Sequence, residues 1–181
     1  MGSDPLHPLA AILSELSEVT AQVDPAQMDQ LVSRMAKARR IFVTGMGRSG
    51  LMARAFAMRL MHLQMKVFVV GETTTPSVGP GDLLICCSRY GRSRSLRTYI
   101  EKAHEAEAEA AVITMYCDTP LARQADYVFQ IAVEKGGQSQ LPMGTIFEQS
   151  LLLYCDAIVL LAMKKLGISE HEMRKRHTQL E

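Results

Sequence analysis

Two segments of this sequence combine serine hydroxyls, arginines and glycines, the groups that proteins commonly use to bind phosphate. The first runs from Gly45 to Gly50 and reads Gly-Met-Gly-Arg-Ser-Gly. Its glycines can expose backbone N–H groups, and where such a loop opens a helix the helix dipole favours an anion. The residues predicted to bind a phosphate here are Gly47, Arg48, Ser49 and Gly50. A tight turn without a ligand is the simpler alternative.

A second polar segment, 88–95, follows another apolar run and opens another predicted helix. Its predicted phosphate or sugar ligands are Ser88, Arg89, Tyr90, Gly91, Arg92 and Ser93. Cations at a helix N-terminus oppose the helix dipole, and a bound anion would relieve that conflict. A solvated charged turn is the alternative, because like-charge repulsion there costs only about a few tenths of a kcal/mol. One phosphate held between both segments accounts best for two hydroxyl-bearing turns.

The first segment also matches the dinucleotide fingerprint G-x-G-x-x-G. In a dinucleotide-binding fold an acidic residue after the second strand binds the ribose, and Glu72 stands at that place. A dinucleotide fold does not need the second hydroxyl-bearing segment in this form. The Gly45–Gly50 segment by itself does not distinguish a sugar phosphate from a dinucleotide.

Glu148 is the candidate general base of this sequence. A carboxylate at the rim of a pocket can move a proton if its environment tunes it for that task. Thr145-x-x-Glu148 also fits a capping box, in which Glu148 would serve only to begin a helix. The histidines give a weaker signal, because His62 fits a packing role and His177 lies in a polar C-terminal stretch. No group of His, Cys, Asp and Glu has metal-ligand spacing, so we expect neither a metal nor a cofactor.

The composition is that of an ordinary globular protein. The chain has 181 residues, of which 48% are hydrophobic and 22% charged, and its formal net charge is +1. Nucleic-acid binders usually carry a strong basic excess, so we expect no nucleic-acid partner. Four cysteines lie in apolar runs, which predicts buried free thiols in a reducing cytoplasm. The apolar stretch 146–163 contains Glu148 and Asp156, so we expect a buried helix and no membrane span.

From residue 41 onward, apolar strand-like segments alternate with helical ones. The predicted strands are 41–44, 67–70, 82–87, 111–115 and 127–133. The predicted helices are 8–21, 25–40, 51–64, 93–108, 120–124, 144–166 and a short one from Ser169, with a polar loop over 134–142. Apolar strands separated by helices predict an α/β fold: a three-layer αβα arrangement around a five-stranded parallel sheet. Because such sheets bind ligands at the carboxyl ends of their strands, the site should follow the first and third strands.

Several segments resemble the SIS (sugar isomerase) domain family, and within it the 6-phospho-3-hexuloisomerases. They are Phe42–Gly50, Phe56–His62, Val70–Thr73, Pro142–Gln149 and Arg176-His177, and the resemblance extends over nearly the whole chain. It implies a flavodoxin-like fold in a single SIS domain over residues 1–181, with N-terminal helices in 1–40, the sheet in 41–133 and C-terminal helices in 144–181. It also implies interconversion of D-arabino-3-hexulose 6-phosphate and fructose 6-phosphate, the step after formaldehyde fixation in the ribulose monophosphate pathway. In this family Gly71-Glu72-Thr73 belongs to the usual pattern without a nicotinamide, which favours a sugar phosphate.

The second segment departs from the family. Its usual form is Ser-x-Ser-Gly-Glu-Thr, whereas this chain has Ser88-Arg89-Tyr90-Gly91-Arg92-Ser93. We expect Tyr90 to narrow the pocket, and the loss of an acid at Arg92 to alter catalysis or substrate. Another SIS-domain aldose–ketose isomerase therefore stays open as an alternative. A non-catalytic phosphosugar sensor ranks lower, since the N-terminal region shows no basic recognition helix.

The expected mechanism is an enediolate proton transfer. The serine hydroxyls and the first loop hold the phosphate, and Glu148 moves a proton between C2 and C3. His62 or His177 would assist ring opening or carry the hydroxyl proton. The helix 144–166 is apolar almost all round, which predicts a homo-oligomer. The resemblance implies that this oligomer is a dimer or a tetramer. His177 is the residue that we expect a neighbouring subunit to donate.

Overall fold

Five strands form one parallel sheet in the part of the chain that a computed structural model describes, residues 7–131, 139 and 141–179. They are β1 (Ile41–Gly45), β2 (Val67–Val69), β3 (Leu83–Cys87), β4 (Glu109–Thr114) and β5 (Tyr127–Gln130), in the order β2-β1-β3-β4-β5. This is the flavodoxin-like order, so the predicted fold class is confirmed. Most of the polar loop predicted over 134–142 lies outside the described residues.

The register of the sheet brings the ends of β1 and β3 together. The two strands pair along their length, from Ile41 opposite Leu83 to Gly45 opposite Cys87. Because β2 lies on the other side of β1, the strand order reverses between β1 and β3. Loops that leave two such neighbouring strands diverge and open a crevice between them. The two predicted phosphate-binding segments therefore begin side by side.

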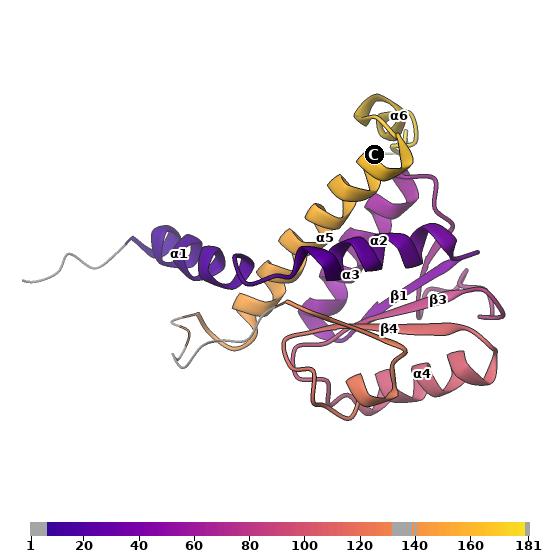
Figure 1. The fold of residues 1–181 in the computed structure, drawn as a ribbon, viewed down its shortest axis with the longest axis horizontal. Coiled ribbons are helices and arrows are strands. Elements are labelled where there is room, and N and C mark those ends of the chain that lie inside the picture. Colours follow the sequence, from indigo (N-terminus) through magenta and orange to yellow (C-terminus); the bar gives the residue numbers. More distant parts are fainter. Residues whose placement is uncertain (1–6, 132–138, 140, 180–181) are drawn as a thin grey trace, which may run out of the picture.

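Helices cover both faces of the sheet (Figure 1). They are α1 (Pro8–Thr20), α2 (Pro25–Lys37), α3 (Gly47–His62), α4 (Arg94–Glu105), the 3-10 turn η1 (Ala122–Gln124), α5 (Thr145–Leu166) and α6 (Glu170–Arg174). Asp24 caps α2, since its side chain accepts a hydrogen bond of 2.8 Å from the N–H of Ala26. The prediction that the third helix starts at residue 51 is wrong, because Gly47 already begins it.

Alternate residues of each strand face two different hydrophobic cores, as the period of two in a strand requires. In β3, Leu83, Ile85 and Cys87 join the core beneath α2, α3 and α5. Leu84 and Cys86 face the smaller core beneath α4. Figure 1 shows α4 on one side of the sheet and α2, α3 and α5 on the other. The sheet is thus the middle layer of three.

The long helix α5 is a core helix of this layered structure. By length and composition alone it could cross a membrane, yet half of its most apolar window is buried within this chain. It packs against α1, α2 and α3. Phe147 and Ile158 are fully buried, whereas Leu153 and Leu160 are exposed, the latter at 67%. The prediction of a buried helix thus describes one side of α5, and the other carries exposed leucines.

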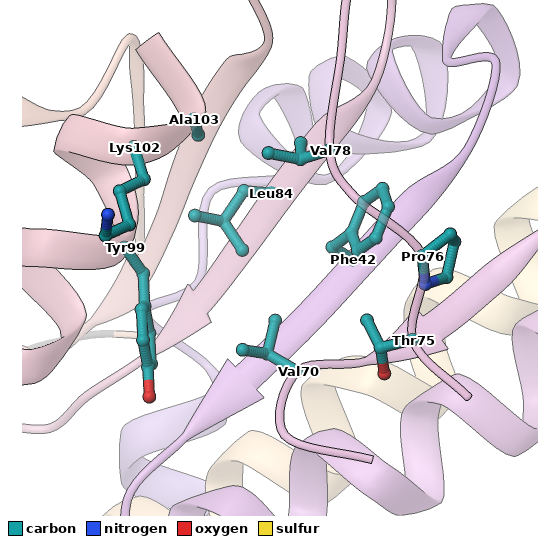
Figure 2. A pocket seen from close by; sticks show the side chains of 9 residues that line it. All are labelled: Phe42, Val70, Thr75, Pro76, Val78, Leu84, Tyr99, Lys102 and Ala103. Atoms are coloured by element: carbon teal, nitrogen blue, oxygen red, sulfur yellow. The ribbon is translucent and has the colours of Figure 1, made fainter. Parts of the chain in front are cut away.

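A small apolar hollow lies beside α4. It has a volume of about 160 Å³, and Figure 2 shows Phe42, Val70 and Leu84 among its lining residues, with Tyr99 and Lys102 on α4. Almost all of its surface is hydrocarbon, and Lys102 is the one charged residue that lines it. A cavity without converging polar groups is poorly suited to catalysis.

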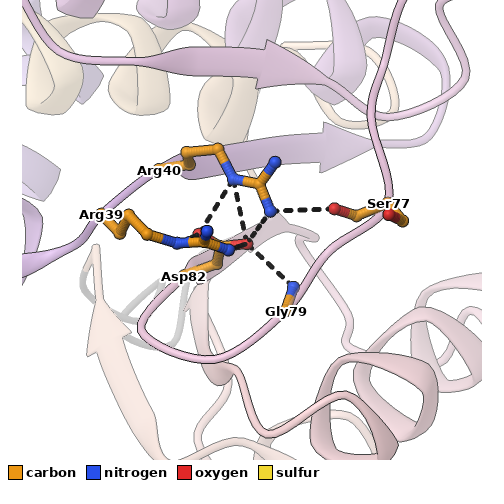
Figure 3. Close-up of polar contacts among 5 residues, drawn as sticks. All are labelled: Arg39, Arg40, Ser77, Gly79 and Asp82. Carbon is orange, nitrogen blue, oxygen red and sulfur yellow. Dashed lines mark hydrogen bonds and ion pairs between the residues drawn. The ribbon is translucent and has the colours of Figure 1, made fainter.

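The turn that leads into β3 is fixed by one buried carboxylate (Figure 3). Asp82 accepts hydrogen bonds from Arg39, from Arg40 at 2.6 Å and from the N–H of Gly79 at 2.8 Å. Burial by itself would raise the pKa of Asp82, but the bonds from Arg40, Gly79 and Arg39 outweigh it and lower the pKa. Arg40 also donates to the carbonyl of Ser77, so the network joins the start of β1 to the turn before β3.

The four cysteines are all free thiols, but the prediction that all four are buried is wrong for one of them. Cys86, Cys87 and Cys155 are buried, and Cys117 is exposed. Cys117 stands just after Tyr116, where the chain leaves β4 and turns toward η1.

Candidate active site

A cleft of about 490 Å³ opens where β1 and β3 end. Its lining residues are Met46, Ser49, Cys87, Ser88, Arg89, Tyr90, Arg92, Ser93, Met143, Gly144 and Glu148. They come from the starts of α3, α4 and α5 and from the ends of β1 and β3. Three helix N-termini therefore meet at one cavity, and their dipoles all favour an anion there.

The Gly45–Gly50 segment is the end of β1 followed directly by the first turn of α3. Gly47 starts the helix with φ 56°, and the first-turn N–H groups of a helix have no intrahelical acceptor. A Cβ at Gly50 would lie 2.4 Å from the carbonyl oxygen of Gly45, so only glycine lets the helix begin this close to the strand. The side chain of Ser49 lines the cleft, and Gly47 and Gly50 shape the turn behind it.

The second segment turns tightly between β3 and α4. Gly91 has φ 56°, and a Cβ there would lie 2.1 Å from the hydroxyl oxygen of Thr119. The hydroxyl oxygen of Ser88 accepts a hydrogen bond of 3.2 Å from the N–H of Gly91. Ser93 caps α4, and its hydroxyl oxygen accepts from the N–H of Leu96 at 3.4 Å. In both serines the oxygen serves as acceptor, so each hydroxyl proton can be donated to an anion in the cleft.

Glu148 lies in the first turn of α5 and faces this cleft. The capping-box alternative is wrong, because Gly144 is the N-cap and the hydroxyl of Thr145 donates to the carbonyl of Pro142 instead. The carboxylate of Glu148 folds back over Gly144, where an added Cβ would lie 2.8 Å from its Oε1. Its side chain is 13% exposed, and its Oε2 lies 2.5 Å from Nε of Arg48. The carboxylate is thus sheltered but opens into the cleft.

One thiol also lines the cleft. Cys87 ends β3, and burial raises its pKa to about 12. The thiol is therefore neutral at physiological pH, and a neutral thiol is a poor nucleophile. This leaves Glu148 as the group in the cleft that is suited to proton transfer.

The two candidate histidines lie in a different cleft. His62 ends α3 and His177 follows α6, and their rings stack with centroids 5.4 Å apart. Their cleft of about 360 Å³ is also lined by Arg59, Glu170, Met173 and Arg174. Ser49 and His62 lie 13 residues apart on one straight helix, which corresponds to about 20 Å. Within one chain the structure brings the two histidines to each other but not to Glu148.

Glu72 does not take part in the cleft. Its carboxylate pairs with Arg54 of α3, and both side chains are about half exposed. A ribose-binding acid would have to face a ligand in the crevice. The described residues also contain no group of three or more His, Cys, Asp and Glu side chains that could hold a metal ion.

Four of the described lining residues were not predicted from the sequence as site residues: Met46, Cys87, Met143 and Gly144. Gly144 could have been found, because it directly precedes the helix that carries Glu148. The methionines gave no signal, since an apolar residue in a loop has no chemistry of its own.

The sequence of this chain is similar to those of a known domain family and of several named proteins. The sequence profile of the SIS domain matches residues 34–159. A protein of Bacillus subtilis named 3-hexulose-6-phosphate isomerase is 37% identical over 179 residues, which cover 96% of this chain and 97% of that protein. A protein of Methanocaldococcus jannaschii with the same name is 42% identical over 154 residues, 85% of this chain and 84% of its own length.

Solved structures share the whole architecture. A hypothetical protein from Methanococcus jannaschii, whose structure was reported to infer a molecular function of 3-hexulose-6-phosphate isomerase, superposes with a TM-score of 0.86. It is 38% identical in sequence, and the match covers 96% of this chain and 98% of that one. The parallel sheet with helices on both sides is therefore a shared fold.

Proposed function

This chain belongs to the SIS domain family, and from that premise we propose that it interconverts D-arabino-3-hexulose 6-phosphate and fructose 6-phosphate. The observation that carries the proposal is the cleft itself, in which two serine-bearing turns at helix N-termini face a single sheltered carboxylate. The two serine-bearing turns suit a phosphate, and the carboxylate of Glu148 suits proton transfer. Relatives that bear the name of this activity match over nearly the whole chain, which supports the same substrate.

The phosphate binds between the two turns in this proposal. Ser49, Ser88 and Ser93 donate their hydroxyls, and the first-turn N–H groups of α3 point at the same anion. Arg92 at the rim supplies positive charge. Anchoring the phosphate fixes the sugar chain, so that its reacting carbons are held near Glu148.

Glu148 then moves the proton. It removes the hydrogen from C2 of the 3-hexulose, which gives an enediolate across C2 and C3, and it returns a proton to C3. The carbonyl has then moved from C3 to C2. Arg48, 2.5 Å from Glu148, lies where a guanidinium can stabilise the negative oxygen of the enediolate.

In this proposal a neighbouring subunit donates His177, which carries the hydroxyl proton of the sugar. Within one chain His177 and Glu148 line different clefts, so His177 can assist Glu148 only across an interface between subunits. Exposed apolar side chains on α1 and α5 support a dimer or a tetramer, among them Leu9, Leu13, Leu153 and Leu160. His62 stacks on His177 and would orient its ring within the assembly.

The setting that we propose is the cytoplasm, with the reaction following formaldehyde fixation in the ribulose monophosphate pathway. Three buried, unbridged cysteines support a reducing compartment.

A second candidate substrate rests on Tyr90 and Arg92. Both line the cleft where the family usually has a serine and a glutamate, so an aldose–ketose phosphate pair is the alternative. The deciding experiment is incubation with D-arabino-3-hexulose 6-phosphate in D₂O, followed by detection of fructose 6-phosphate with deuterium at C3. Turnover of an aldose phosphate with none of the 3-hexulose would select the alternative. Binding of sugar phosphates without any proton exchange would indicate a non-catalytic sensor.

A further inference from the structure

Arg89 joins the two walls of the cleft. From the turn after β3, its guanidinium donates a hydrogen bond to the backbone carbonyl of Met143, which lies just before α5. The two residues are 54 positions apart in the sequence. The bond thus connects the second serine-bearing turn to the segment that begins the helix of Glu148.

The guanidinium of Arg89 packs against an aromatic ring, which in turn stacks on a second one. The guanidinium carbon of Arg89 lies 4.7 Å from the centre of the Tyr90 ring, and Tyr90 in turn stacks on Tyr116 with centroids 5.8 Å apart. A guanidinium over an aromatic face is attracted to the ring, and the planar contact restricts its orientation. The backbone carbonyl of Arg89 also accepts a hydrogen bond of 3.0 Å from the hydroxyl of Thr114. Arg89 is therefore held through its backbone and its side chain.

Met143, which accepts the hydrogen bond from Arg89, has a strained backbone conformation. Met143 has φ 55°, a left-handed conformation that residues other than glycine rarely adopt. Its side chain is 92% exposed, so side-chain packing does not impose this conformation. The bond from Arg89 and the tight turn at Pro142 hold the backbone instead.

Met143 is one residue away from the contact that places Glu148. Gly144 follows it, caps α5 and lies directly beneath the carboxylate of Glu148. A shift of the Met143 carbonyl would move Gly144, against which the carboxylate of Glu148 packs. The position of Glu148 thus depends on a bond made from the opposite wall of the cleft.

We propose that Arg89, Tyr90 and Tyr116 form a strap that positions Glu148, with Arg89 acting on Met143 rather than on the substrate phosphate. The proposal rests on the proposed function, since it assigns Glu148 the proton transfer. Tyr90 falls where the second turn of this chain departs from the form usual in the family, so the aromatic part of the strap is a feature of this chain. Arg89 is a positioning residue, because it acts through the Met143 carbonyl.

The first test separates positioning from phosphate binding. In Arg89→Ala we expect kcat to fall about tenfold or more, while the dissociation constant for inorganic phosphate changes by less than about threefold. Arg123→Ala is the matched control, since Arg123 makes only an exposed ion pair with Asp118 on the surface, and it should keep wild-type kinetics. A loss of phosphate affinity of about tenfold or more with kcat retained would overturn the proposal, and so would unchanged kinetics.

The second test asks whether the aromatic ring acts through the same strap. Tyr90→Ser removes the ring and should lower kcat by about two- to fivefold. Because both residues act on one contact, Arg89→Ala combined with Tyr90→Ser should be no slower than Arg89→Ala alone. Effects on kcat that multiply in the double variant would contradict a shared strap.

The third test does not need a substrate. Amide hydrogen exchange should become faster over residues 144–152 in Arg89→Ala, but not in Arg123→Ala, because the start of α5 loses its anchor. If the wild-type protein does not act on the 3-hexulose phosphate, the proposed function fails, and the exchange rates still decide on the strap. Unchanged exchange over this segment would overturn the strap even if the isomerase activity is found.

Discussion

At the scale of single residues, the cleft combines groups whose roles follow from their contacts. Ser88 and Ser93 accept backbone hydrogen bonds within their own turn, so both hydroxyl protons can be donated to a ligand. Glu148 is held between Gly144 and Arg48, where it is sheltered from bulk water without being closed off. A thiol that stands beside them, Cys87, is kept neutral by burial.

Removal of the Glu148 carboxylate is the sharpest test at this scale. We expect Glu148→Gln to lower kcat by about a thousandfold, because the amide cannot accept the proton. Affinity for inorganic phosphate should stay the same or rise slightly, since Arg48 loses its partner. Steady-state kinetics and phosphate titration measure the two effects. Glu101→Gln on the outer surface of α4 is the control, and near-normal turnover by Glu148→Gln would remove Glu148 from the mechanism.

At the scale of elements, the cleft exists because two glycine-containing turns let helices begin directly at strand ends. Gly47 and Gly91 share the same φ of 56°, but their surroundings differ. A Cβ at Gly47 would meet nothing within 4 Å, whereas one at Gly91 would collide with Thr119. The first turn has open space beside Gly47, and the second packs tightly against Thr119 in the chain that follows β4.

This pair of glycines gives a matched prediction. Gly47→Ala should cost about 1–2 kcal/mol in the free energy of unfolding, the ordinary cost of a left-handed alanine. Gly91→Ala should cost clearly more, because the added methyl group also displaces Thr119. Urea denaturation of both variants measures the difference. Equal losses would mean that the turn relaxes without strain around the added Cβ.

The turn before β3 predicts a dependence of stability on pH. The pKa of Asp82 is lowered in the folded protein, so its contribution is present above the unfolded pKa of about 4 and is lost as pH falls through the folded pKa. Asp82→Asn should therefore destabilise the protein at pH 7 by about 1–3 kcal/mol. The difference from wild type should shrink below pH of about 4.

Urea midpoints at pH 7 and pH 3 measure this effect, and they are compared between wild type and Asp82→Asn. Asp118→Asn is the control, because its ion pair with Arg123 is exposed and should add little at either pH. A stability difference for Asp82→Asn that is as large at pH 3 as at pH 7 would contradict the ionic account of this turn.

At the scale of the whole molecule, the chain separates its candidate catalytic groups into two clefts. Glu148 lies at one end of α3 and α5, and the stacked His62 and His177 lie at the other. An assembly that places the second cleft of one subunit against the first cleft of another would complete the site. The exposed leucines of α1 and α5 offer a surface for such contacts.

Mixing two inactive variants tests a shared site directly. Glu148→Gln and His177→Ala should each be nearly inactive alone. In a mixed dimer one of the two sites has both wild-type residues, so a randomly exchanged mixture should regain about a quarter of wild-type activity. Activity assays after subunit exchange, with light scattering to measure the oligomer, check this expectation. A mixture that stays inactive, although light scattering shows oligomers that exchange subunits, would place His177 outside the site.

The sequence by itself determined the sheet, most helices and both serine-bearing turns of this protein. Those features depend on local patterns: apolar runs make buried strands, and Ser93 followed by a helical segment makes a cap. Thr145 showed the limit of such patterns, because the same spacing fits a capping box that the tertiary structure does not form.

Only the tertiary structure decided which predicted residues meet. His62 and Ser49 belong to one helix of the structure, α3, and the fixed rise of that helix separates them. Arg89 and Met143, in contrast, are 54 positions apart and touch because β3 and α5 deliver their ends to one crevice. Sequence spacing constrains neighbours within an element, whereas contacts between elements depend on how the whole sheet packs.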